Sequence, residues 1–530
     1  MRAAEPSSPK PRPAIRGAGR SRTGRPSSAR ATTAILVIAC TAQFMVILDV
    51  SVLNVALPAM RAELRLGPAG QQWIVNAYTL AFAGLLLLGG RAADLVGTRR
   101  AFLAGVTAFT LASLAGGFAT EGSLLIAARA VQGAGGAVLA PATLTLIMRT
   151  FTEPAARTRA MGAWSAVMAA GGAVGGVVGG VLTEYAGWRW VLFVNVPIGA
   201  GLLAAAVICV PAAEAAGVGA GAGAAGGLRR LDLPGAVSVT LGLTALVHGT
   251  VASGTHAWGA WMVWGSLAAG ALLLAVFVAV ERRAAHPLVP LATLRRRTVA
   301  TANLLVLCMG AAAFSMWFML SLYFQQVLGE SALVAGLCFL PGSAAIVAGA
   351  QIATRLIART GPRPIILTGM TISTVGFLWM SRIGAHADGD YVTDVLGPFV
   401  LATLGAGLSL MPVTAAATSG TAPHEAGLAS GLVNTSRQMG GALGLAMLGT
   451  VAAHAGGGAA GYGRALLVGA ACTAAAGAGA LALPRLRDLN RELDRRELDR
   501  RDPDQRDLNQ RDLKRRELNQ RENDRFPRKG

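Results

Sequence analysis

Apolar runs of about 20 residues, separated by short polar breaks, follow one another from residue 33 to residue 483. A helix of about that length crosses the roughly 30 Å hydrocarbon core of a bilayer. The pattern predicts an all-α polytopic membrane protein with about fourteen transmembrane helices. The expected spans are 33–57, 72–90, 100–119, 123–147, 160–182, 189–210, 234–253, 259–280, 299–321, 332–354, 364–382, 394–416, 429–453 and 463–483.

Composition supports a membrane environment for these runs. Apolar residues make up 53% of the chain and charged residues only 14%, whereas a soluble domain carries about 25% charged residues. Lys and Arg gather at alternate breaks, as at Arg99/Arg100, Arg157/Arg159 and Arg295 to Arg297. Cytoplasmic loops hold an excess of these residues. We therefore expect a multi-pass protein of the cytoplasmic membrane with both termini inside the cell.

The net charge of +20 is carried by these cytoplasmic flanks and by the two ends of the chain, so it indicates anionic lipid rather than nucleic acid. The sequence shows no Walker loop and no H-E-x-x-H or G-x-S-x-G motif in a loop. The five cysteines fall inside expected spans without C-x-x-C spacing. We expect neither an enzyme nor an ATP-driven pump, and no cofactor or metal.

The two ends of the chain differ from the apolar body. Residues 1–31 are rich in Arg, Pro and Ser, which favours a disordered basic tail. From Arg491 the chain repeats five-residue units such as R-E-L-D-R. Leucines five residues apart wind around a helix instead of forming one stripe, so a coiled coil is not expected. A solvated charged tail and a docking element for a partner both remain open.

One carboxylate, Asp49, lies deep inside an apolar run, and no other acid lies at comparable depth. With the N-terminus inside, it lies roughly 24 Å into its span. Arg129, in a span that runs back towards the cytoplasm, lies about 9 Å below the outer surface and thus at a similar depth. An unpaired Asp or Arg in hydrocarbon costs about 2.5–3.5 kcal/mol. We expect the two charges to pair or to share a water-filled cavity.

This pair has two interpretations. It could be a static ion pair that holds two helices together. Alternatively, it could be a proton switch, because burial disfavours a charged carboxylate whereas a nearby guanidinium favours it. Movement of the helices, or entry of a cationic substrate, could then make the carboxylate gain or lose a proton.

Glycine pairs recur every four residues in the fifth span, in G-G-A-V-G-G-V-V-G-G-V-L. A face of small residues lets another helix approach closely. The pairs could serve plain close packing or form a seam that bends and slides against the opposite half of the protein. They are Gly171, Gly172, Gly175, Gly176, Gly179 and Gly180.

Other polar residues inside the spans are candidates to line a substrate cavity, although such a residue more often makes a hydrogen bond between helices or anchors a helix at the membrane interface. They are Gln43, Asn54, Asn76, Tyr78, Gln132, Asn303, Asn434 and Arg437, with Trp317, Tyr323 and Gln438 as further positions. His248 in the seventh span could titrate near neutral pH or simply pack within an accessory helix.

Several segments together resemble the major facilitator superfamily, and more narrowly its fourteen-span drug:proton antiporter branch. They are L-D-V-S-V-L-N-V-A-L-P (48–58), G-R-A-A-D-L-V-G-T-R-R (90–100), R-A-V-Q-G-A-G-G-A (129–137), the glycine span, W-R-W-V-L-F-V-N-V-P-I-G (188–199) and G-L-A-S-G-L-V-N-T-S-R-Q-M-G-G-A-L-G (427–444). This resemblance covers most of residues 33–483 and excludes both tails.

The resemblance implies a major facilitator fold, in which two six-helix bundles rock around a central cavity and two helices are inserted between them. The implied division is a basic tail (1–31), an N-terminal bundle (32–211), a Gly/Ala linker with two accessory helices (212–297), a C-terminal bundle (298–484) and a repeat tail (485–530). The implied roles are proton coupling by Asp49 and Arg129 and a cytoplasmic gate formed by Gly90, Asp94, Gly97, Arg99 and Arg100.

Three departures from the family pattern change these expectations. The glycine span reads Gly175-Gly176 where a Pro commonly follows a Gly, which softens the expected kink. The related loop in the second half has Ala358 where an acid is expected, so the charges at the cytoplasmic gate differ between the two halves. A further acid that some relatives place in a later cavity-lining span is missing, which argues against recognition of doubly charged cations.

We therefore expect a secondary active exporter that exchanges protons for amphipathic small molecules. The resemblance implies drugs or antibiotics as its substrates. An exporter of an endogenous metabolite or self-made antibiotic would use the same residues. A membrane sensor or scaffold that acts through the C-terminal tail is the alternative from another class.

Overall fold

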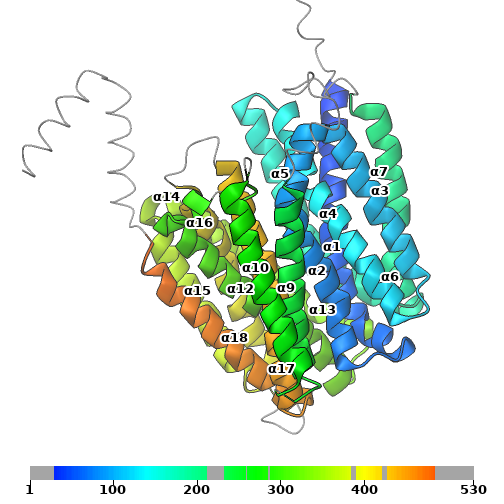
Figure 1. The fold of residues 1–530 in the computed structure, drawn as a ribbon, viewed down its shortest axis with the longest axis vertical. Helices are drawn as coiled ribbons and strands as arrows, with labels where there is room; N and C mark the ends of the chain where they lie inside the picture. The colour runs from blue at the N-terminus through cyan, green and yellow to red at the C-terminus, as the bar shows by residue number, and fades with distance from the viewer. Residues whose placement is uncertain are drawn as a thin grey trace, which may run out of the picture.

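The computed structural model describes residues 29–211, 232–257, 259–284, 287–289, 291–383, 390–419 and 426–483. Most of the expected basic tail, the Gly/Ala linker and the repeat tail lie outside these residues. Within them every regular element is helical (Figure 1). The elements are α1 (Ala29–Glu63), α2 (Pro68–Val96), α3 (Thr98–Gly117), α4 (Gly122–Thr150), α5 (Pro154–Tyr185), α6 (Arg189–Phe193), α7 (Asn195–Cys209), α9 (Leu233–Ser253), α10 (Trp261–Arg283), α11 (Leu291–Leu294), α12 (Arg297–Leu322), η2 (Tyr323–Val327), α13 (Ala332–Cys338), α14 (Leu340–Thr360), α15 (Pro362–Met380), η3 (Tyr391–Leu396), α16 (Gly397–Thr418), α17 (Ala426–His454) and α18 (Gly458–Ala480).

Two of the expected spans are each built from two α-helices. The sixth span consists of α6 and α7, which meet at Val194, and the tenth consists of α13 and α14, which meet at Phe339. Each break is followed within a few residues by a proline, Pro197 or Pro341. Proline removes one helical hydrogen bond and crowds the carbonyl four residues earlier. Hydropathy detects both spans but does not detect their breaks.

Twelve of the helices in the described part of the chain are long and apolar enough to cross a membrane. Two others, α15 and α17, occupy expected spans but are not among those twelve. The sequence of α15 opens with Pro362-Arg363-Pro364, and α17 carries Asn434 and Arg437 in its middle. These polar residues lower the hydropathy of helices that pack among the others in the bundle.

The helices form two bundles with an accessory pair between them. Helices α1 to α7 pack together, as do α12 to α18, while α9 and α10 pack on each other and α9 also contacts α2 and α17. Figure 1 shows α9 and α10 in green, side by side across the boundary between the bundles. The expected insertion of two helices between the halves therefore matches the arrangement.

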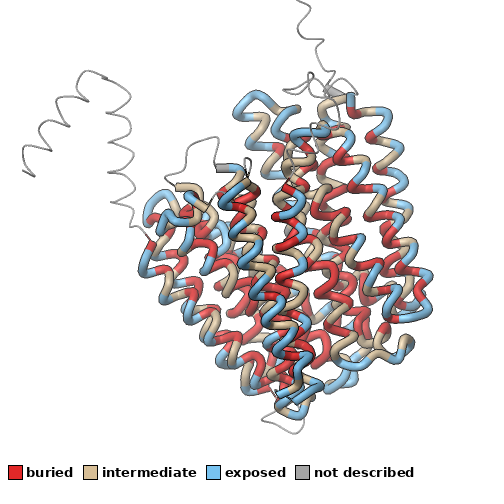
Figure 2. The backbone as a smooth tube through the Cα atoms, in the orientation of Figure 1, coloured by how far each residue is buried: buried red, intermediate tan, exposed pale blue. Residues whose placement is uncertain are grey.

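Exposed residues recur along the outward-facing sides of the helices (Figure 2), and many of them are large and apolar. Leu272 on α10 is 66% exposed, Leu111 on α3 59% and Ile208 on α7 81%. Such surfaces are unusual on soluble monomers and are suited to contact with lipid, so this is a multi-pass membrane protein. We call the end that carries the arginine-rich breaks, expected to be cytoplasmic, the inner end, and the opposite end the outer end.

Candidate functional site

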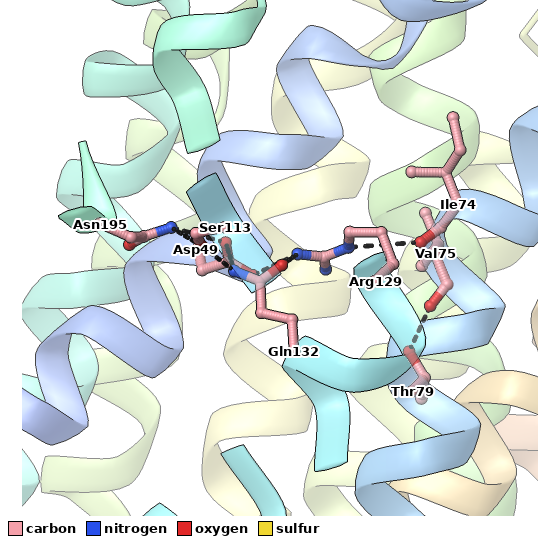
Figure 3. Close-up of polar contacts among 8 residues, drawn as sticks. All are labelled: Asp49, Ile74, Val75, Thr79, Ser113, Arg129, Gln132 and Asn195. Carbon is pink, nitrogen blue, oxygen red and sulfur yellow. Dashed lines mark hydrogen bonds and ion pairs between the residues drawn. The ribbon is translucent and has the colours of Figure 1, made fainter. Parts of the chain in front are cut away.

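Asp49 on α1 and Arg129 on α4 form an ion pair inside the N-terminal bundle (Figure 3). The Arg129 Nη1 lies 2.6 Å from Asp49 Oδ2, and the two residues are 1% and 0% exposed. Their expected pairing is therefore confirmed. Because neither group reaches water, each depends on the other and on nearby polar groups for its solvation.

Three further side chains complete the surroundings of the carboxylate. Gln132 Nε2 on α4 and Asn195 Nδ2 on α7 donate to Asp49 Oδ1 at 2.6 and 2.9 Å. Ser113 Oγ on α3 accepts from both amides, at 2.6 and 3.2 Å. Gln132 Oε1 in turn accepts from Arg129 Nη1 at 2.7 Å. One charge pair thus connects α1, α3, α4 and α7, and we call these five residues the charge network.

The guanidinium of Arg129 also contacts α2. Its Nε donates to the Ile74 carbonyl at 3.4 Å, and its Cζ lies 4.4 Å from the centre of the Tyr78 ring. The face of an aromatic ring attracts a cation most strongly where water is excluded. Close approach of α2 requires Gly133, where a Cβ would lie 2.3 Å from the Tyr78 carbonyl oxygen. A rearrangement of Arg129 would therefore also change its contacts with α2.

Sequence reasoning did not assign Ser113 or Asn195 to this site. Asn195 stands within the quoted segment W-R-W-V-L-F-V-N-V-P-I-G, where it is the only amide in the sixth span, so a signal was present. Ser113 carried none, because a serine in a membrane helix commonly bonds to its own backbone. Both residues are fully buried or nearly so.

The residues of the expected cytoplasmic gate gather at the turn between α2 and α3. Gly97 separates the two helices with φ +98°, a conformation that favours glycine. Arg99 donates to the Val207 carbonyl of α7 at 3.0 Å, whereas Asp94 and Arg100 are exposed. In the part of the chain that the structure describes, Asp94 forms no ion pair. The turn is therefore present, but its charges are not locked together in this conformation.

The glycine pairs of α5 serve two different contacts. A Cβ at Gly175 or Gly179 would meet Ser51 or Val52 of α1, and one at Gly171 would meet Ile47. A Cβ at Gly176 or Gly180 would instead meet backbone atoms of α13, at 3.1 and 2.7 Å. Gly172, one turn nearer the inner end, has nothing within 4 Å. The contact of α5 with the opposite bundle is thus made at the outer end and is lost towards the inner end.

Side chains reinforce this outer contact between the bundles. Ser321 Oγ and Gln325 Nε2, at the end of α12 and in η2, donate to the carbonyls of Asn54 and Val55 on α1 at 2.6 and 2.9 Å. Glu184 Oε2 on α5 accepts from the backbone N–H of Ala332 on α13 at 3.1 Å. We call these three hydrogen bonds, with the Gly176 and Gly180 contacts, the outer seam. It would have to separate for the outer side to open.

The structure divides the expected cavity residues into groups. Gln132 and Tyr78 contact the charge network, as described. Gln43 on α1 accepts from Thr143 on α4 at 3.4 Å. Asn303 on α12 donates to the Val299 carbonyl of its own helix and accepts from Ser436 on α17, so both residues make hydrogen bonds between helices. Asn76 is fully buried and neither polar atom of its side chain has a partner. The partly exposed members are Asn54, Asn434 and Arg437.

His248 lies on α9, away from the charge network. Its Nδ1 is 3.0 Å from Ser266 Oγ on α10, and its ring centre is 6.2 Å from that of Trp73 on α2. These contacts link the accessory pair to the N-terminal bundle. They favour the packing interpretation of this histidine.

Two helical bundles that meet across a seam, with a buried charge network inside one of them, define a membrane transporter. The sequence model of the Major Facilitator Superfamily matches residues 39–445. This chain belongs to that family. The expected fold is thereby confirmed, and the family match indicates a transporter rather than an enzyme.

Curated relatives are similar over most of their length. The cephamycin export protein CmcT of Amycolatopsis lactamdurans is 47% identical over 441 residues, which cover 82% of this chain and 88% of the relative. The puromycin resistance protein pur8 of Streptomyces alboniger is 40% identical over 423 residues, covering 79% and 82%. The tetracenomycin C resistance and export protein of Streptomyces glaucescens is 32% identical, covering 77% and 74%.

A solved structure shares the fold. The crystal structure of a bacterial homologue of the human lysosomal transporter Spinster covers 87% of this chain and 97% of its own, with a TM-score of 0.57 and 16% identity. At that identity the likeness concerns the fold alone.

Proposed function

We propose that this protein is a proton-driven exporter of antibiotic-like small molecules. The observation that carries the coupling part of this proposal is the buried charge network, in which Asp49 is the carboxylate of the only buried ion pair among the described residues. An ionisable group inside a membrane helix is a candidate for proton transfer. The names of the relatives, which export or give resistance to cephamycin, puromycin and tetracenomycin C, support antibiotics as cargo.

Protonation of Asp49 would change each contact that its carboxylate makes in the network. A neutral carboxyl no longer attracts Arg129 and can accept fewer hydrogen bonds than a carboxylate. Arg129 would keep Gln132 Oε1, the Ile74 carbonyl and the Tyr78 ring. The helices α1, α4 and α7 would then be held together less tightly, which gives the proton an effect on bundle geometry.

The outer seam supplies the element on which this change acts. α1 belongs to both features, because it carries Asp49 and also presents the Asn54 and Val55 carbonyls to α12 and η2. We infer that binding of a proton from outside loosens the outer seam while the turn around Gly97 closes the inner end. When the outer seam closes again, the proton is released and the inner end opens. Such reciprocal opening is the mechanism of alternating access.

The energy available from the gradient is sufficient for accumulation. One charge that crosses 100 mV gains about 2.3 kcal/mol, and each 1.4 kcal/mol is a factor of ten in concentration. A single proton per cycle therefore supports a concentration ratio of about fortyfold before the pH difference is added.

The test is transport by purified full-length protein in proteoliposomes with an imposed pH gradient. Cephamycin, puromycin and other antibiotics are added singly, and the change in internal pH is recorded together with uptake of the compound. We expect Asp49→Asn to abolish proton movement coupled to substrate. Asp390→Asn is the matched control, since Asp390 caps a helix at the outer end and Asn caps as well as Asp.

Coupling in Asp49→Asn that equals the wild-type value would overturn the role of the charge network. Failure of every antibiotic to move, in a protein shown to be folded, would overturn the cargo class.

A further inference from the structure

Arg437 is a deep cation that the charge network does not use. It lies eleven residues after the inner end of α17, which corresponds to about 17 Å and places it near the middle of the bilayer. Its Nη2 donates to Asn434 Oδ1, one turn earlier on the same helix, at 3.1 Å. That amide is neutral, so the charge of Arg437 is not balanced by this contact.

The side chain points between the two bundles rather than towards lipid. Gly441 and Gly444 of α17 pack on α12, and Gly431 and Gly449 pack on α2 of the opposite bundle. At 100° per residue Arg437 falls within the face that packs on α12, whereas Asn434 falls on the stripe between the two packed faces. Arg437 is partly exposed, and its hydrogen bond to Asn434 draws the guanidinium towards that stripe.

No carboxylate in the described membrane helices is placed to neutralise it. Asp49, the deep acid, is already bonded to Arg129 and two amides. The described acids of the C-terminal bundle, Glu330, Asp390 and Asp394, stand at the outer end. Because Asp49 and Arg129 cancel, the middle of the membrane region keeps one positive charge, at Arg437.

We propose that Arg437 is part of the substrate site and makes it selective for amphipathic anions, such as carboxylates or sulfonates attached to an apolar ring system. This inference rests on the proposed exporter function. A guanidinium binds a planar carboxylate or a sulfonate through two parallel hydrogen bonds. An anion would satisfy a charge that is costly to leave unpaired at this depth, whereas a cationic substrate would be repelled by it.

The position of the residue also fits a role in the cycle. α17 packs on α2 of the opposite bundle, with Gly449 against Gln72 and Gly431 against Leu87. An anion held by Arg437 would therefore lie beside the surface along which the bundles move against each other. The sequence places no second acid as deep as Asp49 in an apolar span, which agrees with a site that does not select doubly charged cations.

The test uses two fluorescent ligands that differ by one charged group. They are 8-anilinonaphthalene-1-sulfonate and its uncharged analogue N-phenyl-1-naphthylamine. Binding to the full-length protein in lipid nanodiscs is measured by fluorescence polarisation, with empty nanodiscs subtracted. We expect the wild type to bind the sulfonate about ten- to a hundredfold more tightly, as a charged hydrogen-bonded pair provides.

The variants assign that preference to one residue. Arg437→Gln should bind both ligands about equally, and Arg437→Lys should keep part of the preference because it keeps the charge but not the paired donors. Arg464→Gln, which removes an arginine from α18 of the same bundle, is the matched control and should retain the full preference. Each variant is checked by size-exclusion chromatography and by thermal unfolding.

Equal binding of the two ligands by the wild type, or an unchanged preference in Arg437→Gln, would overturn the inference. The same samples are assayed for proton-coupled transport, so that two failures can be separated. Coupled transport without an anion preference overturns only the role of Arg437. An anion preference that Arg437→Gln removes, in a protein that moves no protons, supports the site and overturns the coupling proposal.

Discussion

The Asp49 carboxylate and the Arg129 guanidinium meet at 2.6 Å between α1 and α4, with neither group exposed to solvent by more than 1%. Burial of two charges costs several kcal/mol for each ion, and their attraction repays that cost only when hydrogen bonds satisfy the remaining atoms. Gln132 and Asn195 supply those bonds. The pair is therefore stable as a pair, while either charge alone is costly.

A double-mutant cycle should reveal this dependence. Asp49→Asn leaves Arg129 buried without a counter-charge. Arg129→Gln leaves the Asp49 carboxylate buried without one. Each single substitution is expected to cost about 3–5 kcal/mol of stability. The double variant restores neutrality and should cost less than the sum of the two. Unfolding of the purified proteins in detergent measures the three values, and additive costs would show that the two charges do not interact.

Asn195 provides a test of proton coupling that leaves both charges in place. Its amide donates to Asp49 at 2.9 Å, and a hydrogen bond to a carboxylate favours the charged form. Loss of this donor in Asn195→Ala should favour the protonated form. The pH dependence of transport is then expected to move towards higher pH, as measured in proteoliposomes at a fixed gradient.

Ser113→Ala is the control for this prediction, because Ser113 contacts the two amides and not the carboxylate. It should move the pH dependence by a smaller amount. An identical profile for Asn195→Ala and the wild type would argue that Asp49 does not carry the transported proton.

The sequence was enough to predict the ion pair but not the network around it. Span direction and the rise of 1.5 Å per residue placed Asp49 and Arg129 at one depth, and the cost of an unpaired charge then required a partner. The positions of Ser113 and Asn195 depend on how α3 and α7 are rotated about their axes, which hydropathy does not define. The same limit applies to α5, where the repeat showed a smooth helix but not which glycines face α1 and which face α13.

The two faces of α5 lead to a prediction about the outer seam. A Cβ at Gly180 would lie 2.7 Å from backbone atoms of Ala332 and Leu333, whereas a Cβ at Gly172 meets nothing within 4 Å. Gly180→Ala should therefore force α5 and α13 apart at the outer end. Gly172→Ala should leave the seam intact and gain about 0.5–1 kcal/mol, since alanine favours a helix over glycine.

Spin labels at Val181 and Val334, which are 40% and 37% exposed, can measure this separation in a cysteine-free background. We expect a longer or broader distance distribution for Gly180→Ala than for the wild type and Gly172→Ala. Identical distributions in all three proteins would show that the glycine contact does not keep the outer side closed.

Glu281 leads to a prediction at the inner end, where the chain passes from α10 towards the C-terminal bundle. This residue is 3% exposed, and its two carboxylate oxygens accept from the backbone N–H groups of Leu288 and Val289 at 3.1 and 3.2 Å. Arg91, in the last turns of α2, donates to the carbonyl of Pro287. The connection is thus held from both sides, by the accessory pair and by the N-terminal bundle.

Glu281→Gln should release this connection. The amide oxygen of Gln can still accept from one of the two backbone N–H groups, but the amide NH2 group would face the other N–H group, donor against donor. The loss of a hydrogen bond to a charged acceptor, with a backbone donor left unpaired, is expected to cost about 1–3 kcal/mol. Trypsin should then cleave faster at Arg282, Arg283 or Arg295, which flank the connection. Glu153→Gln is the matched control, since Glu153 makes no capping bond with its side chain. Equal cleavage rates in the two variants would mean that the Glu281 carboxylate does not hold the connection, and that Arg91 and the surrounding apolar contacts do so.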